Sequence, residues 1–413
     1  MKKVVTIGVS GFASVHFRDL KRQHSYGNIS IVAATVINQE EELERCAWLT
    51  EHGCQLFTDF QEMLAEYRNR ADVCIIPTGI HWHLPMTEAA LKAGMNVLLE
   101  KPAAATIQEV LYMKQLELEA EKRVYIGYQH MYSDQVWRAK ADILADKIGK
   151  IRVLKSCGIW PRSAAYFNRN DWAGKLRNQD RWILDSPFNN AFAHWLNLLC
   201  FLSGPSLVES ASPKEIQAEL YRANDIESAD TACMRILTDT GITLLLYLTH
   251  ASTKKVEPSL EVLGEHGQIT IQEFPPQKKR NDVNYYIIAK EKENELRDQM
   301  YETILERSQS IGCSLENASK QTICTNGAHE SSPINPIPKE CLKKVATADD
   351  YFVYINDIDE IIRDAHKNEQ LFSEMDTVSW AKPGNKVSLS DYSSFTDLCE
   401  ANPPLKSKSL RVY

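Results

Sequence analysis

The sequence has no run of apolar residues long enough to cross a membrane. Its most apolar stretches, such as ITLLLYL at 242–248, are far shorter than the ~20 residues that span a bilayer. The opening MKKVVTIGVSGF has two lysines, but glycine and serine soon interrupt its apolar run, unlike that of a secretory signal peptide. We therefore expect a cytoplasmic protein with no membrane partner.

Metal-binding cysteine spacing is absent as well. The ten cysteines include no CxxC pair and no Cys/His ligand pattern, so we expect reduced, mostly buried thiols and no metal site. Acidic residues outnumber basic ones: the chain has 47 Lys and Arg and 55 Asp and Glu, which gives a net charge of −8. A nucleic-acid partner needs a basic field, so none is expected.

Strand and helix patterns alternate up to about residue 128. Apolar, β-branched runs such as KVVTIGVS, ISIVAATVI, ADVCIIP and NVLLE are separated by helical patterns. This alternation is typical of an α/β fold with a parallel, doubly wound sheet. Since 413 residues usually exceed one core, we predict a Rossmann-type, dinucleotide-binding domain over residues 1–127 and a second domain over 128–413.

The second part of the chain has a different rhythm. Apolar runs follow one another mostly without helices, which predicts an α+β domain with a large, mostly antiparallel open sheet: KIRVLKSCGIW, IQAELYRAN, TACMRILT, ITLLLYLTHAS and LEVLGEHGQITIQ. Helices are expected at NNAFAHWLNLLCFLSG and DYFVYINDIDEIIRDAHKN. Residues 275–344 are polar, so we expect irregular surface excursions there, with ELRDQMYETILERSQ as a candidate helix. The chain would end in an irregular arm.

The string IGVSGFASVHF joins the first predicted strand to the first helix. In a dinucleotide-binding turn, the N–H groups of the helix N-terminus face a pyrophosphate and glycines let the backbone come close. Gly8 fits the first glycine position, Ser10 stands at the second and Ala13 at the third, with Gly11 and Phe12 between them. These five residues are candidate cofactor contacts; a simple tight turn is the alternative.

The end of the second strand lacks the acidic residue that usually binds the ribose of NAD. In VAATVINQEE the expected position falls on Val36 or Ile37, and Asn38 follows as the candidate contact. No arginine offers a site for a 2′-phosphate. The choice between NAD and NADP is therefore open.

The stretch NVLLEKP ends a predicted strand on a charged pair and a proline. Ligands of doubly wound sheets bind at the carboxyl ends of the strands. Pro102 restricts the backbone at Lys101, so the lysine would be aimed into the site, with Glu100 beside it. A surface Glu–Lys pair at the end of an edge strand is the alternative.

The longer string IIPTGIHWHLPMTEAALKAGMNVLLEKPAAAT resembles the Gfo/Idh/MocA family, which includes glucose–fructose oxidoreductase and inositol dehydrogenase. VYIGYQHMYS is similar to the next strand of that family, where Gln129 would lie near the nicotinamide. The resemblance extends to about residue 265. It implies cofactor contacts at Pro77, Thr78, His83, Glu100, Lys101 and Gln129.

A second signature of the family is a helix with the pattern DxxxHxxD. Here Asn190, His194 and Asn197 occupy those positions, so both carboxylates are amides. The preceding DSPFNN resembles a distinct branch of the family built around DSPxNN. The resemblance implies that His194 is the catalytic base, that Lys101 binds the same substrate oxygen, and that Asn190 orients the substrate or the imidazole. Loss of the carboxylate should lower the pKa of His194.

Candidate substrate contacts lie around this helix and on the strands of the second sheet. Aromatic, amide and charged side chains suit a sugar, although each of them could instead serve packing or a turn: Trp172, Arg177, Asp185, Asn189 and Arg222.

Three functions remain open at this point. The first is an NAD(P)-dependent oxidoreductase that transfers hydride between its cofactor and a sugar, polyol or related carbohydrate hydroxyl. The second is a redox-neutral lyase or glycoside hydrolase with tightly bound NAD, and the third is a non-catalytic ligand-binding regulator. The resemblance also implies a homodimer or homotetramer, formed through an exposed face of the second sheet.

Overall fold

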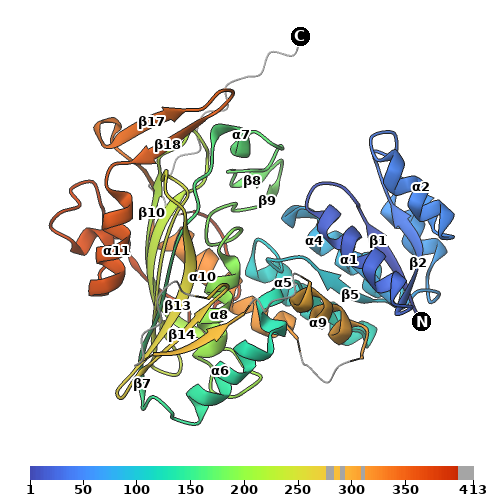
Figure 1. Cartoon of the computed structure of the whole chain (residues 1–413), viewed down its shortest axis with the longest axis horizontal. Helices are drawn as coiled ribbons and strands as arrows, with labels where there is room; N and C mark the ends of the chain where they lie inside the picture. The colour runs from blue at the N-terminus through green and yellow to red at the C-terminus, as the bar shows by residue number, and fades with distance from the viewer. Residues whose placement is uncertain (276–282, 289–293, 308–311, 399–413) are drawn as a thin grey trace.

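The computed structural model describes residues 1–275, 283–288, 294–307 and 312–398. They form an N-terminal unit around one sheet and a C-terminal unit around a larger one, and the two units lie side by side (Figure 1). The predicted fold class is confirmed, with a parallel Rossmann-type sheet followed by an α+β unit. The domain division at residue 127 lies just after the last strand of the first sheet and remains a prediction.

The first sheet is parallel throughout, in the order β3-β2-β1-β4-β5-β6. Its central strands are short and buried, as expected for a parallel sheet covered by helices. The strands are β1 (Lys2–Ile7), β2 (Ile29–Thr35), β3 (Gln55–Phe57), β4 (Val73–Ile76), β5 (Asn96–Leu99) and β6 (Val124–Ile126). The helices are α1 (Ala13–Ser25), α2 (Leu43–Glu51), α3 (Phe60–Glu66), η1 (Ile80–Trp82), α4 (His83–Lys92) and α5 (Ile107–Ala120).

The second sheet has nine strands in the described part of the chain and is mostly antiparallel, apart from the pairs β7–β12, β10–β16 and β14–β15. Its strands are β7 (Ile151–Ile159), β10 (Pro213–Arg222), β11 (Thr231–Thr238), β12 (Thr243–Thr249), β13 (Val256–Gly264), β14 (Gln268–Gln272), β15 (Val283–Ile287), β16 (Ile334–Pro336) and β19 (Lys386–Ser388). Two small hairpins join β8 (Arg177–Asn178) to β9 (Arg181–Trp182) and β17 (Leu342–Ala346) to β18 (Tyr351–Ile355). The helices are η2 (Gln129–Tyr132), α6 (Asp134–Leu144), α7 (Ala164–Phe167), α8 (Ala193–Leu202), α9 (Glu295–Ile304), α10 (Leu315–Ser331), η3 (Lys339–Cys341), α11 (Ile358–Asn368) and η4 (Phe372–Glu374).

Helices cover both faces of the second sheet. One face packs against α6, α8 and α10, and the opposite face packs against α11 (Figure 1). On the α11 face, Tyr221, Leu245 and Tyr247 form a core with Ile362 and Phe372. The expectation of a homo-oligomer assumed an exposed sheet face. That assumption is wrong for the central strands, because the C-terminal part of the same chain covers them; the oligomeric state stays a prediction.

The segment expected to form irregular surface excursions contains α10, a 17-residue helix with mostly buried polar side chains. Asn326 Oδ1 accepts a hydrogen bond from the N–H of Ile107 at 2.9 Å, and its Nδ2 donates to the carbonyl of Ala105 at 2.8 Å. Because such amides satisfy buried backbone groups, a polar sequence can form an interior helix, and the expectation was wrong there. The candidate helix at ELRDQMYETILERSQ is confirmed as α9.

The C-terminal part also differs from expectation. DYFVYINDIDEIIRDAHKN begins as strand β18, whose aromatic and β-branched residues favour pairing with β17, and only its second half is helical. The expected irregular arm contains β19, which pairs with β10. Over the described ranges, no helix is both long and apolar enough to cross a membrane.

Replacing Asn326 by alanine is expected to destabilise the fold. The change leaves the buried N–H of Ile107 and the buried carbonyl of Ala105 without partners, which costs about 1–3 kcal/mol for each group. Urea denaturation would measure the loss in the free energy of unfolding. The matched control is Asn294→Ala, since Asn294 is exposed and makes no side-chain cap bond at the start of α9. Equal losses in the two variants would contradict the role assigned to Asn326.

Candidate active site

The turn between β1 and α1 has the backbone of a dinucleotide-binding loop. Gly8 and Gly11 have φ angles of +97° and +57°, which residues other than glycine rarely adopt. A Cβ added at Gly11 would meet nothing within 4 Å, so conformation and not space selects glycine there. Within the described residues, the N–H groups of Ser10, Gly11 and Phe12 have no backbone or side-chain acceptor, and α1 begins at Ala13. Free amides at a helix N-terminus fit the pyrophosphate of NAD.

The end of β2 carries the candidate ribose contact Asn38. Its Nδ2 donates to Glu41 Oε2 at 3.0 Å, and Ile37 beside it is 82% exposed. Glu41 and the exposed Glu40 thus bring negative charge close to this end of the strand. A carboxylate here can accept hydrogen bonds from ribose hydroxyls, and it repels a 2′-phosphate.

Lys101 lies in the turn after β5, and hydrogen bonds of His83 hold this turn in place. The Lys101–Pro102 peptide is cis. His83 Nδ1 lies 2.9 Å from the carbonyl of Pro102, and its Nε2 lies 3.2 Å from the carbonyl of Thr78, so the ring joins the turns after β4 and β5. The side chain is 0% exposed, and burial lowers its pKa. His83 therefore offers no exposed surface for the predicted cofactor contact, and its position suits a role in shaping the lysine turn.

Glu100 lies behind Lys101 in a buried chain of hydrogen bonds. Its Oε1 is 2.7 Å from His16 Nε2, and His16 Nδ1 is 3.1 Å from the Tyr301 hydroxyl. Its Oε2 accepts from the backbone N–H of Lys101 at 3.0 Å. Burial raises the pKa of Glu100, but the hydrogen bond from His16 and nearby positive charge outweigh burial and bring the pKa to about 2. Glu100 is thus an anion that fixes the turn, and the sequence did not predict its partners.

Lys101 reaches the C-terminal unit and binds Asn190. Its Nζ donates to the backbone oxygen and to Oδ1 of Asn190, both at 3.0 Å. Asn190 Nδ2 donates to Asp185 Oδ1 at 2.9 Å, and Asp185 Oδ2 accepts from the N–H of Gly174 at 2.6 Å. Burial lowers the pKa of Lys101 and raises that of Asp185, while the opposite charge of each acts against burial. One amide therefore links a half-buried cation to a buried carboxylate.

His194 lies at the start of α8, among other rings. Its ring centroid is 4.8 Å from that of His130 and 5.6 Å from that of Tyr128, and its buried Nδ1 has no hydrogen-bond partner in the described chain. Burial lowers the pKa of His194 well below its usual range, and the positive charge of Lys101 acts in the same direction. The predicted effect of the missing carboxylate is a separate comparison and stays a prediction. The ring is neutral at pH 7 and able to accept a proton.

The other predicted cofactor contacts lie near the turns after β4 and β6. Pro77 is buried, and Thr78 Oγ1 is 3.4 Å from the sulfur of Met86. Gln129 Oε1 accepts from Nη1 of Arg297 at 3.1 Å, and Arg297 also forms an ion pair with an aspartate of α1. The helix α9 therefore connects the dinucleotide-binding helix to the side where the resemblance puts the nicotinamide.

Apart from Asp185, the predicted substrate contacts interact with groups other than Lys101 and His194 in the described residues. Trp172 packs with Trp182 in a small apolar cluster, and the guanidinium of Arg177 lies 3.5 Å from the centroid of the Trp182 ring. Asn189 is 0% exposed, and its Nδ2 donates to two backbone carbonyls at 3.1 and 3.2 Å. Arg222 donates to a loop carbonyl at 2.8 Å. The last two residues therefore hold loops in place, a role that residue type alone does not distinguish from substrate binding.

A group beside Lys101 was missed by the sequence reasoning. The guanidinium groups of Arg162 and Arg169 lie 4.3 and 3.7 Å from the centroid of the Tyr166 ring. The charge of Arg169 contributes to the pKa shifts of both Lys101 and Asp185, so this group borders the site. The available signal was the string WPRSAAYFNRNDW, in which arginines alternate with aromatic residues.

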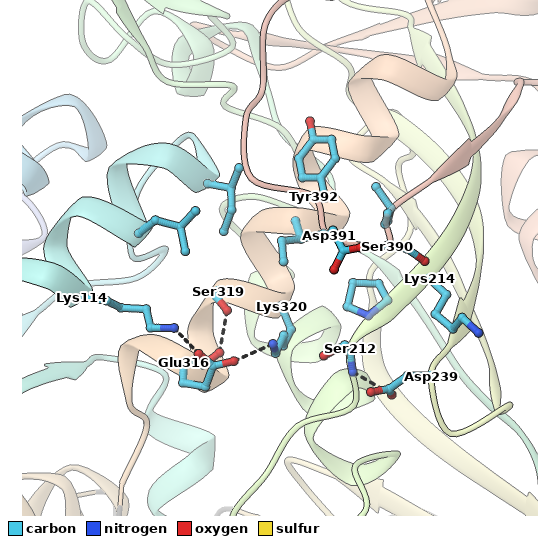
Figure 2. Close-up of a pocket in the computed structure, with 15 residues that line it drawn as sticks. Lys114, Ser212, Lys214, Asp239, Glu316, Ser319, Lys320, Ser390, Asp391 and Tyr392 are labelled. Carbon is cyan, nitrogen blue, oxygen red and sulfur yellow. Dashed lines mark hydrogen bonds and ion pairs between the residues drawn. The ribbon is translucent and has the colours of Figure 1, made fainter.

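A separate pocket of about 430 Å³ lies between α5, α10, the start of β10 and the C-terminal arm (Figure 2). At its side, Glu316 binds both Lys114 and Lys320, and Asp239 accepts from the backbone N–H of Ser212 at 2.9 Å. The pocket contains none of the predicted site residues. Lys114 and Lys320 both pair with the carboxylate of Glu316. The lysine, asparagine and histidine described above therefore form the better candidate for an active site.

Comparison with known proteins identifies relatives of this chain. Residues 2–128 match the Gfo/Idh/MocA family, described as an oxidoreductase family with an NAD-binding Rossmann fold. The 1-carboxy-3-chloro-3,4-dihydroxycyclohexa-1,5-diene dehydrogenase of Comamonas testosteroni is 31% identical over 119 residues, which are 28% of this chain and 30% of that protein. The dTDP-3,4-didehydro-2,6-dideoxy-alpha-D-glucose 3-reductase of Streptomyces violaceoruber is 25% identical over 273 residues, 65% and 73% of the two chains. The matches thus span from under a third to about three quarters of these relatives.

A solved structure shares the fold. The WlbA dehydrogenase of Bordetella pertussis, in complex with NADH and UDP-GlcNAcA, gives a TM-score of 0.64 at 19% identity over 79% of this chain and 96% of its own. The likeness covers more of the chain than residues 2–128, so the shared fold continues into the C-terminal unit.

Replacing Lys101 by methionine is expected to raise the pKa of His194. The lysine charge disfavours protonation of the ring, so its removal makes protonation easier. Histidine ring signals followed by NMR against pH would show the shift, with His194→Gln used to assign the signal. His250 is the internal control, because burial and two arginines, and not Lys101, bring its pKa to about 3. An unchanged His194 midpoint would contradict the proximity of the two groups.

Proposed function

Since this chain belongs, through residues 2–128, to the Gfo/Idh/MocA family of NAD-binding oxidoreductases, we propose that it transfers hydride between a nicotinamide cofactor and a hydroxyl of a sugar, polyol or related carbohydrate. The observation that carries the proposal is the 3.0 Å contact between Lys101 and Asn190. It brings a half-buried cation at the carboxyl edge of the Rossmann sheet close to the helix that bears His194. Relatives named as a dehydrogenase and a sugar reductase support the same chemistry.

His194 is the proposed general base. Its lowered pKa leaves a neutral imidazole at pH 7, which can take the proton of the substrate hydroxyl. When bound, the nicotinamide supplies the acceptor or donor of the hydride. Lys101 gives two of its three N–H groups to Asn190, which leaves one for the substrate oxygen, where a cation stabilises developing negative charge. Asn190 orients the lysine.

Two other functions receive less support. A redox-neutral lyase or glycoside hydrolase would hold NAD tightly through its cycle, and a non-catalytic regulator would need neither Lys101 nor His194. Both groups have pKa values shifted by burial beside a cofactor-type turn, which is typical of catalytic residues. The names of the two relatives also favour net oxidation or reduction.

Net formation of NADH is the expected signature of the proposed function. We expect NADH to accumulate when the protein is mixed with NAD and a panel of sugars and polyols, followed by absorbance at a fixed enzyme concentration. Mass spectrometry of the supernatant after denaturation would measure how much cofactor copurifies. Stoichiometric NAD without NADH accumulation would support the redox-neutral function instead.

Lys101→Met and His194→Gln are each expected to reduce kcat by about 100- to 10,000-fold, the usual contribution of general acid–base and electrostatic groups. The Kd for NADH, measured by fluorescence, should change little, since these groups act on the hydroxyl. Lys92→Met is the matched control, because Lys92 is an exposed lysine of α4 that pairs with Glu88. Retention of kcat in either site variant would remove that residue from the mechanism.

NADH is expected to bind more tightly than NADPH. Glu40 and Glu41 put negative charge beside Asn38, where a 2′-phosphate would meet repulsion. Fluorescence titration with both cofactors would measure the ratio of the Kd for NADPH to the Kd for NADH. The Glu41→Arg variant should have a smaller ratio. Equal Kd values in the unmodified protein would contradict this assignment of the ribose end.

A further inference from the structure

Two arginines beside the candidate site lack an acidic partner. Both guanidinium groups lie over the Tyr166 ring, and among the described residues neither Arg162 nor Arg169 forms an ion pair with a carboxylate. Arg169 Nη1 donates to the carbonyl of Tyr166 at 2.6 Å. The buried Nε of Arg162 has no acceptor in the described structure. Guanidinium N–H groups are thus left without partners at this point.

The arginine pair borders the reacting groups. The ring of Phe192, the residue that precedes the helix bearing His194, stacks on His250 with centroids 5.6 Å apart. The ring centroid of His250 lies 6.4 Å from that of Tyr166. Burial together with the two arginines brings the pKa of His250 to about 3, so this histidine is neutral and adds no charge at pH 7.

Three acidic side chains close to the arginine pair in sequence, or in contact with its neighbouring residues, have other partners. Glu257 pairs with Lys255 at 2.5 Å, and Asp171 accepts from the side chain of Asn178 at 2.9 Å. Asp350 accepts from two backbone N–H groups at 3.0 and 2.7 Å. In the described part of the chain, none of these three carboxylates forms an ion pair with Arg162 or Arg169.

Charges of both signs lie around the pair. Asp171 and Asp350 keep their negative charge, because the amide and N–H groups that donate to them are neutral. No carboxylate of the described residues forms an ion pair with Arg162 or Arg169, so both guanidinium groups stay available to an anion.

We propose that the substrate carries an anionic group, a carboxylate or a phosphate, which binds Arg162 and Arg169 while its reacting hydroxyl meets Lys101 and His194. This inference rests on the proposed function and names the substrate class. Guanidinium groups bind either anion through paired N–H groups, and stacking on Tyr166 keeps both of them in place. A neutral sugar would give the two guanidinium groups no ion pair.

The experiment compares neutral and anionic probes on the full-length protein saturated with NADH. The probes are glucose, myo-inositol, glucuronate and glucose 6-phosphate, and calorimetric titration gives each Kd. We expect at least one of the two anionic probes to bind about tenfold or more tightly than both neutral probes. Preference for glucuronate identifies a carboxylate as the group recognised, and preference for glucose 6-phosphate identifies a phosphate.

Substitution of both arginines tests whether Arg162 and Arg169 themselves bind the anion. In the double variant Arg162→Met/Arg169→Met, the Kd for the preferred anion should rise about 10- to 100-fold, while the Kd values of the neutral probes stay unchanged. Arg70→Met is the matched control, since Arg70 lies 5.2 Å over the Tyr67 ring on another part of the chain. Circular dichroism would verify that both variants are folded.

Neutral probes that bind as tightly as the anions would overturn the inference. So would a preference that persists in the double variant, or an absence of binding by both anions. These outcomes leave the proposed function standing, because hydride transfer tests it separately. Failure to bind NADH, or to transfer hydride with any sugar or polyol, would count against the proposed function itself.

Discussion

The contact between Lys101 and Asn190 is the constraint on which the site depends. A buried ammonium group is costly unless oxygens surround it, and here two oxygens of one asparagine lie 3.0 Å from Nζ. Lys101 follows the fifth strand of the first sheet, whereas Asn190 precedes the helix that bears His194. This hydrogen-bonded pair therefore joins the two units at the site, and movement of either turn would displace the cation from the helix that bears the imidazole.

An amide at position 190, in place of a carboxylate, leaves more of the positive charge of Lys101 without a neutralising partner. A carboxylate there would form a direct ion pair with Lys101. Asn190 instead accepts from Lys101 and donates to Asp185, so the negative charge lies one side chain farther from the cation. Because Coulomb attraction weakens with distance, less of the lysine charge is neutralised and more remains for an oxygen that becomes negative during the reaction.

The parts of the site that the sequence predicted depend on neighbouring residues. The strand pattern predicted where Lys101 lies in the fold. Its role and that of His194 came from the resemblance to family motifs and stay predictions. The hydrogen bond between His16 and Glu100, and its continuation to Tyr301, joins three distant segments and has no local signature. The helix α10 was missed for a related reason. Its amides are polar and therefore score as surface residues in a hydropathy analysis, although they are buried and bind backbone groups that are far away in the chain.

The helix α10, which belongs to the polar segment 275–344, holds two turns of the site in place. Gln321 Nε2 donates to the carbonyl of Phe188 at 3.0 Å, just before Asn190, and Asn326 Nδ2 donates to the carbonyl of Ala105 at 2.8 Å, just after the lysine turn. Since one rigid helix holds both turns, it sets their separation and hence the distance from the lysine to its asparagine. A site assembled in this way forms only when both units and α10 have docked. Its geometry therefore depends on the stability of the whole chain and not on either sheet alone.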